Sequence, residues 1–382
     1  MKFKTTRTLK CLSLVQFFVL TILCFNANTA TSQTVTNVFP TRVTTSSEVT
    51  IIGTGFTSGL ASSISLPNIS IGSKTFVSST EMTFVITRSN TEASGDTTST
   101  LSIGSATFDS GVNRSFNYVG PSSKSVTDSS TYRVREVYTT WDQNNNGTGF
   151  WKSSDFVSGD TSTWPNDSHE LLGFKMNYGG NDIIFSAGVN DNLLETELAS
   201  LGVDVSATST EYVSQDFKAY STNGVSGKPN SNNYIGFADK IDGSTGTIVL
   251  NNTVRKTVYD VIIDGIKGLD MGTGIANFNN QADIRFYSGN GDIGAVNDGV
   301  PDLLITQIAQ PGGSDVYYYA DVDGNVVGRP VKLAFINNNN NRLYQWKVDF
   351  YRLDYSSGST FETAIPTTAS FGNGQNRGFR MA

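Results

Sequence analysis

The sequence is short of the residues on which disulfide scaffolds and many enzymes depend. Its two cysteines, Cys11 and Cys24, both lie in an apolar N-terminal segment, and His169 is its single histidine. A mature chain without that segment would have no thiol, which excludes disulfides and thiolate nucleophiles. One histidine also excludes a two-histidine zinc site, and a lone histidine is most often a structural residue.

Charged residues are also few, at 16% of the chain, and their balance is acidic. The formal net charge is −7, and subtracting the four basic residues of the first 32, which include no acid, leaves −11 for the remainder. Because phosphate neutralisation supplies most of the affinity for nucleic acids, an acidic chain without basic patches is not expected to bind them. Cations are favoured over phosphates as bound ions.

Long apolar runs are absent except for one near the N-terminus. A basic start is followed by the apolar run Cys11–Phe25 and then by a small, polar stretch, which is the layout of a secretory signal. The run is too short for a membrane span, and Ala30 and Ser32 predict cleavage before Gln33. We therefore expect residues 1–32 to be a signal peptide and the mature protein, without a transmembrane span, to be secreted or on the cell surface.

Short alternating strands and turn residues dominate the rest of the chain, so the sequence predicts an all-β protein. The clearest strand is Leu343–Leu353, where Trp346, Val348 and Phe350 alternate with polar or amphipathic residues. A single short helix is expected where LLETELASL comes after an Asp191–Asn192 N-cap and precedes Gly202 as the C′ glycine.

The length of 382 residues favours two domains. In residues 33–119, the segments Phe39-Pro40, Thr50–Phe56 (TIIGTGF) and Phe116–Tyr118 (FNY) resemble the pattern of the immunoglobulin-like TIG (IPT) domain. The resemblance implies a β-sandwich that acts as a rigid spacer or interaction module. It implies no catalytic residues and supplies no ligand.

Residues 120–125 predict a linker, and residues 126–382 a larger, jelly-roll-like β-sandwich. In style, phrases such as WDQNNNGTGFW and YADVDGNVVG resemble the secreted surface-protein β regions of Bacteroidetes, without carrying an active site across. The final residues, Gly378–Ala382, look like the start of a strand, so we expect the large domain to be truncated at its C-terminus.

Calcium is the one cofactor that the motifs indicate. Asp142, Asn144 and Asn146, followed by a glycine, match the opening of a calcium loop, in which alternate oxygens point inward. The twelfth position is Ser153 in place of the bidentate glutamate, and Asp155 is the candidate to replace it. The competing interpretation is an ordinary Asn-rich turn.

Two further acidic segments have the composition of cation-binding loops. Asp298 and Asp302 resemble the cation-binding part of a repeat loop, although Asp302 also suits a turn before the apolar residues next to it. Asp321–Asn325 contains an Asp-Gly pair between two apolar runs, which predicts a β-hairpin turn rather than a metal site.

Three tryptophans, Trp141, Trp151 and Trp164, lie close together among acidic residues. If exposed, they are typical of a carbohydrate-binding sandwich, where rings stack on sugars. The interpretation that the sequence favours is that they fill the core of a large sandwich.

Catalysis is left with one option, a pair of carboxylates as in glycoside hydrolysis. Asp167, Glu170, Glu195, Glu197 and Glu211 are available, but no pattern shows which of them converge. We therefore expect a non-enzymatic extracellular binding or adhesion protein with a protein or glycan partner. The alternatives are a carbohydrate-binding or glycan-degrading accessory protein and a structural surface-layer or filament component.

Overall fold

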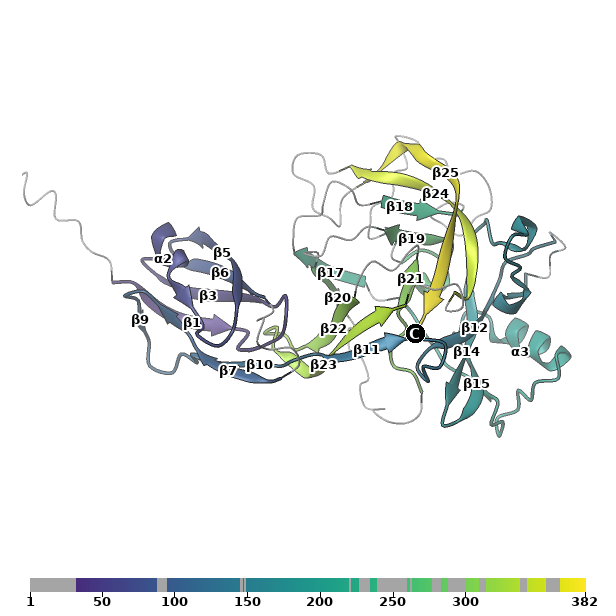
Figure 1. Ribbon diagram of the computed structural model, residues 1–382, viewed down its shortest axis with the longest axis horizontal. Helices are drawn as coiled ribbons and strands as arrows, with labels where there is room; N and C mark the ends of the chain where they lie inside the picture. Colours follow the sequence, from purple (N-terminus) through teal and green to yellow (C-terminus); the bar gives the residue numbers. More distant parts are fainter. Residues whose placement is uncertain are drawn as a thin grey trace, which may run out of the picture. The chain divides into compact units, whose positions relative to one another are not determined.

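The computed structural model divides into two compact units (Figure 1). It describes residues 32–87, 95–144, 147, 149–219, 221–226, 234–238, 260–261, 263–276, 283–287, 300–308, 314–336, 342–354 and 365–382. Unit 1 comprises Met1–Pro121 and Tyr318–Pro330, and unit 2 comprises Ser122–Tyr317 and Val331–Ala382. The predicted signal peptide lies outside the described residues. No helix within the described ranges is long and apolar enough to cross a membrane.

Unit 1 is a β-sandwich built on one core. Its sheets have the strand orders β5-β6-β3-β1-β9 and β2-β10-β7, with the small pair β4-β8 beside them. Val49 and Ile51 from the first sheet share the core with Val43 and Tyr118 from the second. The elements are β1 (Thr34–Phe39), β2 (Arg42–Val43), β3 (Glu48–Thr54), α2 (Ser58–Ser62), β4 (Ile64–Ser65), β5 (Ile71–Ser78), β6 (Glu81–Ile86), β7 (Thr97–Thr100), β8 (Ser102–Ile103), β9 (Thr107–Phe108) and β10 (Ser115–Tyr118).

A hairpin tip from far along the chain completes unit 1. Strands β22 (Ser314–Ala320) and β23 (Val326–Phe335) are joined by the predicted Asp-Gly turn, where Gly324 has a φ of 82°. The side-chain oxygen of Asn325 accepts hydrogen bonds from the backbone N–H groups of Thr41 at 2.9 Å and Arg42 at 3.2 Å. Asn325 thus contacts two residues that lie 284 and 283 positions earlier in the chain, and no local sequence pattern could have predicted these contacts.

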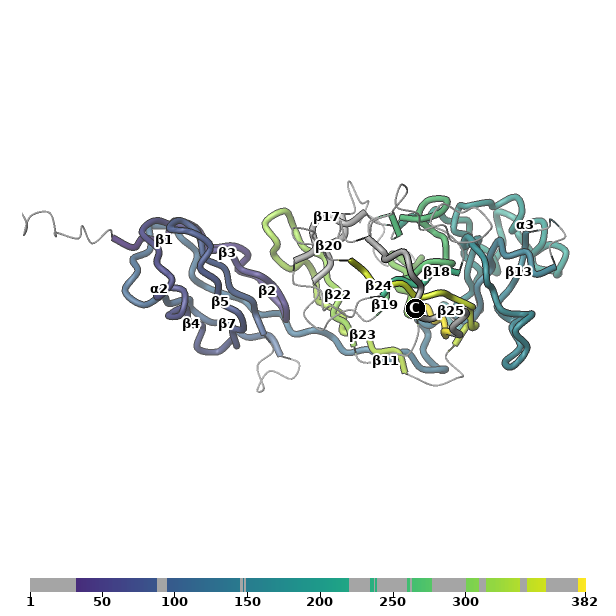
Figure 2. Tube along the Cα trace, turned by 90° about the horizontal axis from the view of Figure 1, so that it is seen from above, coloured from purple at the N-terminus to yellow at the C-terminus, as the bar shows by residue number. Residues whose placement is uncertain are grey.

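The predicted linker contains a strand. Residues Ser122–Val126 form β11, which pairs in parallel with β23 from Ser122–Val331 to Val126–Phe335 (Figure 2). Composition predicts a linker because the segment is short and polar, and its ordering depends on a partner strand about 200 positions later.

Unit 2 contains two five-stranded sheets that share a core. Their orders are β13-β12-β14-β15-β16 and β19-β18-β24-β25-β21. Val137 and Phe174 of the first sheet belong to the same cluster as Trp346 and Val348 of the second. The remaining elements are β12 (Val134–Thr139), β13 (Trp151–Lys152), η1 (Ser153–Asp155), η2 (Thr161–Thr163), β14 (Leu171–Tyr178), β15 (Asn181–Ser186), α3 (Asp191–Ser200), β16 (Tyr212–Val213), β17 (Ser221–Ser226), β18 (Tyr234–Phe237), η3 (Ile266–Gly268), β19 (Thr273–Ala276), β20 (Asp283–Tyr287), β21 (Thr306–Ile308), β24 (Tyr344–Asp354) and β25 (Ile365–Met381).

The clearest local predictions hold in unit 2. Strand β24 alternates buried Trp346, Val348 and Phe350 with less buried residues. Helix α3 begins one residue after Asn190, which is the N-cap in place of the predicted pair because its side chain accepts from Leu193 N–H at 3.2 Å.

The strand expected at the C-terminus starts earlier than predicted, whereas the expected truncation of the large domain stays a prediction. Gly378–Ala382 reads as the start of a strand, but Gly378 lies near the end of the 17-residue strand β25. This stretch pairs with β21 on one side and β24 on the other, as in Phe379 with Ile308 and Tyr344. Local composition predicts a strand here but does not give its length.

Candidate functional site

The predicted calcium loop has, where it is described, the form of a turn. One carboxylate oxygen of Asp142 accepts from Gly147 N–H at 2.6 Å, and Asn144 lies in a turn. Asp155 accepts from the Lys152 ammonium at 2.5 Å, which balances its charge locally. Asn146 lies outside the described residues.

Of the two residues in the second predicted cation site, one is described by the structure. Asp298 lies outside the described residues, and Asp302 lies in a bend just before Leu303. Across the described part of the chain, no group of three or more His, Cys, Asp or Glu side chains is arranged to hold a metal ion. Calcium binding at either segment stays a prediction.

The three clustered tryptophans are buried, with exposed fractions of 5% for Trp141, 2% for Trp151 and 5% for Trp164. The ring centroids of Trp141 and Trp151 lie 5.4 Å apart in an edge-to-face arrangement, and Trp151 packs in the same way on Tyr344 at 5.3 Å. The indole N–H of Trp164 donates to the carbonyl of Val157 at 3.0 Å. Rings placed in this way pack a core, the alternative that the sequence favoured, and present no stacking face to a sugar.

The five candidate carboxylates are not brought into one site. Glu195 accepts from the Tyr212 hydroxyl at 3.1 Å, and Glu211 from Asp204 N–H at 3.1 Å. Asp167 accepts from the adjacent Ser168 N–H at 2.9 Å. Glu170 alone of the five is buried.

Glu170 lies instead beside Asp270, an acid that the sequence reasoning missed. The two residues form an isolated antiparallel β-bridge, 100 positions apart in the chain. Both carboxylate oxygens of Asp270 are hydrogen-bonded, one to the N–H groups of His169 at 3.1 Å and Gly272 at 2.6 Å, the other to the Ser168 hydroxyl at 3.0 Å. Asp270 therefore ties the segment before β14 to the loop before β19.

His169 belongs to the same buried network. Its Nδ1 lies 2.8 Å from the carbonyl oxygen of Asp167, so Nδ1 must carry the proton and donate it. Nε2 then accepts from the hydroxyl of Tyr344 at 2.9 Å. Burial lowers the pKa of His169, against the opposing charge of Asp270, and the ring is neutral. All its hydrogen-bonding capacity is used internally.

Only one of the two carboxylate oxygens of Glu170 has a hydrogen-bond partner. Its Oε1 accepts from Ile266 N–H at 2.8 Å, but its Oε2 is buried without a hydrogen-bond partner, and the residue is 8% exposed. Burial raises the pKa of Glu170 to about 7; the Ile266 hydrogen bond opposes this rise, and the negative charge of Asp270 adds to it. The carboxyl group therefore takes up a proton in the neutral pH range.

The loop that Glu170 contacts has an unusual backbone. Gly265, Lys267 and Gly268 all have positive φ, at 85°, 57° and 73°. A Cβ at position 265 would lie 2.7 Å from both Glu170 Oε2 and Asp270 Cβ and closer still to Glu170 Oε1, so only glycine fits there. Lys267 has a Cβ and is strained in this conformation, a feature that clusters at functional sites.

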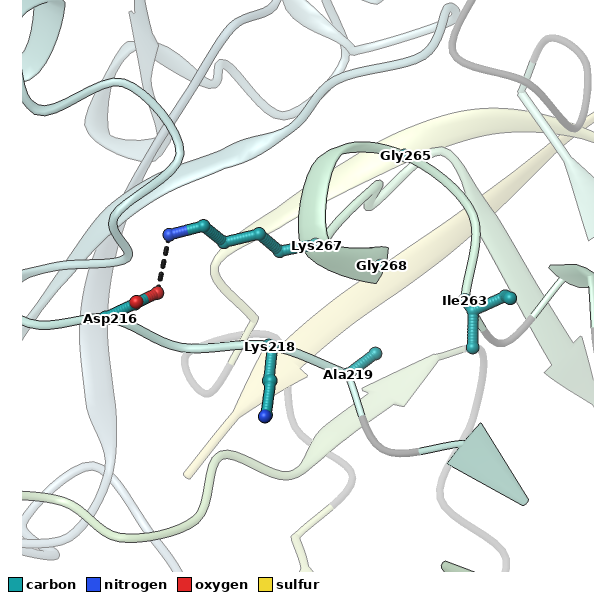
Figure 3. Close-up of a pocket in the computed structure, with 7 residues that line it drawn as sticks. All are labelled: Asp216, Lys218, Ala219, Ile263, Gly265, Lys267 and Gly268. Atoms are coloured by element: carbon teal, nitrogen blue, oxygen red, sulfur yellow. Dashed lines mark hydrogen bonds and ion pairs between the residues drawn. The ribbon is translucent and has the colours of Figure 1, made fainter. Parts of the chain in front are cut away.

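The same loop walls an open cleft of about 430 Å³ (Figure 3). The ammonium group of Lys267 pairs with Asp216 at 2.5 Å, whereas the side chain of Lys218 extends away from that pair. Ile266, in the same loop, is 53% exposed. The lining consists of Asp216, Lys218, Ala219, Ile263, Gly265, Lys267 and Gly268.

Comparisons with known proteins give no further guide to this site. No protein-family profile matches the chain, and neither the curated proteins nor the solved structures contain a match.

Proposed function

We propose that the protein is a non-enzymatic extracellular or cell-surface binding protein and that the cleft beside the Asp264–Asp270 loop contacts its partner. Residues 33–119 serve, in this proposal, as a TIG-like spacer or interaction module. The observation that carries the proposal is a strained, well-supported loop that carries the exposed Ile266 next to a cleft lined by Lys218.

The support beneath the loop favours a preformed binding surface. Two hydrogen bonds fix the main chain of the loop: Ile266 N–H donates to the Glu170 carboxyl group, and Leu171 N–H donates to the Leu269 carbonyl at 3.0 Å. A loop fixed in this way loses little conformational entropy when a partner binds. Functional residues are commonly found on loops held by a rigid β scaffold.

The chemistry at the cleft suits recognition more than catalysis. Glu170, whose pKa is raised, lies against Gly265 and is not among the cleft-lining residues. His169 is fully buried and occupied by two internal hydrogen bonds. The cleft is lined by two lysines, the carboxylate of Asp216 that pairs with one of them, the apolar side chains of Ala219 and Ile263, and the main chain of two glycines.

A protein partner fits these groups better than a sugar does. Exposed Ile266 supplies apolar contact area, and Lys218 supplies a cation for a carboxylate on the partner. Sugar recognition through stacking would require exposed aromatic rings, and the three tryptophans considered for that role are buried. The expected partner is therefore an extracellular protein segment with a carboxylate beside an apolar side chain.

The test uses mature protein, residues 33–382, on an array of synthetic peptides that carry Asp or Glu at varied spacings from Leu or Phe. We expect micromolar binding to a subset of the peptides, with at least about a fivefold loss in Lys218→Glu and in Ile266→Ser. Lys124→Glu and Leu201→Ser are matched controls, because Lys124 is exposed and Leu201 is 53% exposed, as Ile266 is. If Lys218→Glu and Ile266→Ser bind the peptides as well as their controls do, the cleft and its loop are not the binding site.

Export is tested separately. Mass spectrometry of protein recovered outside the cytoplasm should find a mature N-terminus near Gln33. Recovery of an intact chain that begins with Met1, in the cytoplasm only, would contradict an extracellular function.

A further inference from the structure

We propose that Glu170 is a proton-operated latch for the Asp264–Asp270 loop: the protonated side chain keeps the loop closed over it, and loss of the proton releases the loop and reshapes the cleft. The inference rests on the proposed function and deepens it, because it assigns regulation to the same cleft. Its central observation is a carboxyl group buried under the loop with one oxygen bonded to the loop and the other without a hydrogen-bond partner.

The contact between Glu170 and the loop is direct. Oε1 accepts from Ile266 N–H at 2.8 Å, and both carboxylate oxygens lie so near Gly265 that a Cβ on that residue would clash with them. Oε2 has almost no surface accessible to water in the closed loop. An ionised carboxylate in this position keeps one oxygen unsolvated and unbonded, whereas a protonated one removes the charge.

The charged groups around Glu170 strengthen this preference. Asp270, its bridge partner, adds a negative charge that disfavours a second one on Glu170. Asp264 is a further buried acid at the start of the loop, and its carboxylate accepts from Gly265 N–H at 3.1 Å. His169 offers no positive charge, since burial lowers its pKa.

The cation of the loop itself is directed elsewhere. The Lys267 ammonium group pairs with the carboxylate of Asp216, as the dashed line in Figure 3 marks, and this ion pair occupies it. The closed loop therefore stabilises the protonated form of Glu170. Its pKa of about 7 in this geometry agrees with that reasoning.

The loop is suited to move once the latch is lost. Three of its residues have positive φ, and one of these, Lys267, carries a steric cost because it has a Cβ. Such a backbone persists only where its surroundings hold it. Gly265, Lys267 and Gly268 all line the cleft, so a change in the loop is a change in the cleft.

The direction of the pH dependence is set by linkage between proton binding and closure. In the closed loop the pKa of Glu170 is about 7, and in an open, hydrated loop it returns towards its ordinary value of 4.5. Closure therefore binds a proton, and the stability that this proton gives to the closed loop is fully present below the open-state pKa and is lost as the pH rises through about 7. Between about pH 6 and about pH 8.5 the closing equilibrium should weaken roughly tenfold.

The experiment is amide hydrogen exchange on the mature chain, with rates corrected for intrinsic pH dependence. Peptides that cover residues 264–272 should lose about tenfold protection between about pH 6 and about pH 8.5, while peptides from β24 should not. Glu170→Gln, which is neutral at every pH and can still accept from Ile266 N–H, should remove this dependence. Glu195→Gln, which alters a carboxylate of helix α3, is the matched control and should keep it.

Equal corrected protection at both pH values in the wild type would overturn the latch. So would the same tenfold change in Glu170→Gln. The measurement needs no ligand, so peptide-array binding without pH-dependent exchange removes the latch alone, and pH-dependent exchange without array binding removes the proposed function of the cleft alone.

Discussion

Substituting alanine for Gly265 provides a sharp test of how closely the loop packs on Glu170. Two costs act together at this position. An L-residue at a φ of 85° is destabilised by roughly 1–2 kcal/mol, and the new methyl group would collide with the Glu170 carboxyl group and Asp270. Overpacking of this kind costs about 1–3 kcal/mol, so the total loss in the free energy of unfolding should be about 2–5 kcal/mol.

Gly202 supplies the matched control. It lies just after helix α3 with a φ of 84°, nearly the same as that of Gly265, but a Cβ there would meet nothing within 4 Å. Gly202→Ala should therefore lose only the backbone contribution, about 1–2 kcal/mol. Gly265 also has a ψ of −173°, a backbone region that essentially only glycine occupies, so the difference between the two variants contains extra backbone strain as well as the collision with Glu170.

Urea denaturation followed by tryptophan fluorescence is the assay, because all four tryptophans lie in unit 2. Adding Glu170→Ala to Gly265→Ala should cost less than the sum of the two single changes, since the carboxyl group that the methyl meets is gone. Equal losses for Gly265→Ala and Gly202→Ala would refute the close packing of loop and carboxyl group.

Three other predictions concern separate parts of the chain. Burial alone would raise the pKa of Glu136, but hydrogen bonds from Lys175, Ser154 and Tyr138 outweigh burial and lower it. Glu136→Gln should therefore reduce the free energy of unfolding by about 1–3 kcal/mol at neutral pH, and by progressively less as the pH falls through the lowered pKa. Urea titrations at about pH 7 and about pH 3 would measure both losses. Millimolar calcium should raise the melting temperature of the mature chain by a few degrees if the loop at Asp142 binds the ion, and Asp142→Ala should abolish the rise; identical melting in chelator and in calcium would return the loop to an ordinary turn. Asn325→Ala removes the acceptor shared by two backbone N–H groups, so it should destabilise unit 1 by about 1–2 kcal/mol in thermal denaturation while unit 2 is unchanged.

The sequence was most informative where a structure depends on near neighbours. The alternation along β24, the Asp-Gly turn before β23 and the helix that precedes Gly202 are all encoded within about a dozen residues. Each was predicted from the sequence, and the helix start was displaced by only about one residue because capping depends on a single side chain. The burial of the tryptophans also agreed with their size and apolar character.

The candidate site could not be predicted in the same way. Glu170 was one of five acids, and its distinguishing property is burial beside Asp270, which depends on a bridge across 100 positions. A weak signal was present in the segment DGIKGLDMG, residues 264–272, where three glycines lie among two acids. Glycines at such spacing indicate a tight loop, but they do not identify the carboxyl group that packs beneath it.

The hairpin tip that completes unit 1 has a consequence for the order in which the protein folds. As the chain emerges from the ribosome, Thr41 and Arg42 appear early, whereas Asn325 arrives 284 residues after Thr41. Until then, the Thr41 and Arg42 N–H groups of the N-terminal sandwich lack the acceptor that they have in the complete fold. Closing so long a loop carries an entropic cost and slows folding. Premature release of a shortened chain would leave the first unit unfinished although every residue of its sandwich strands is present.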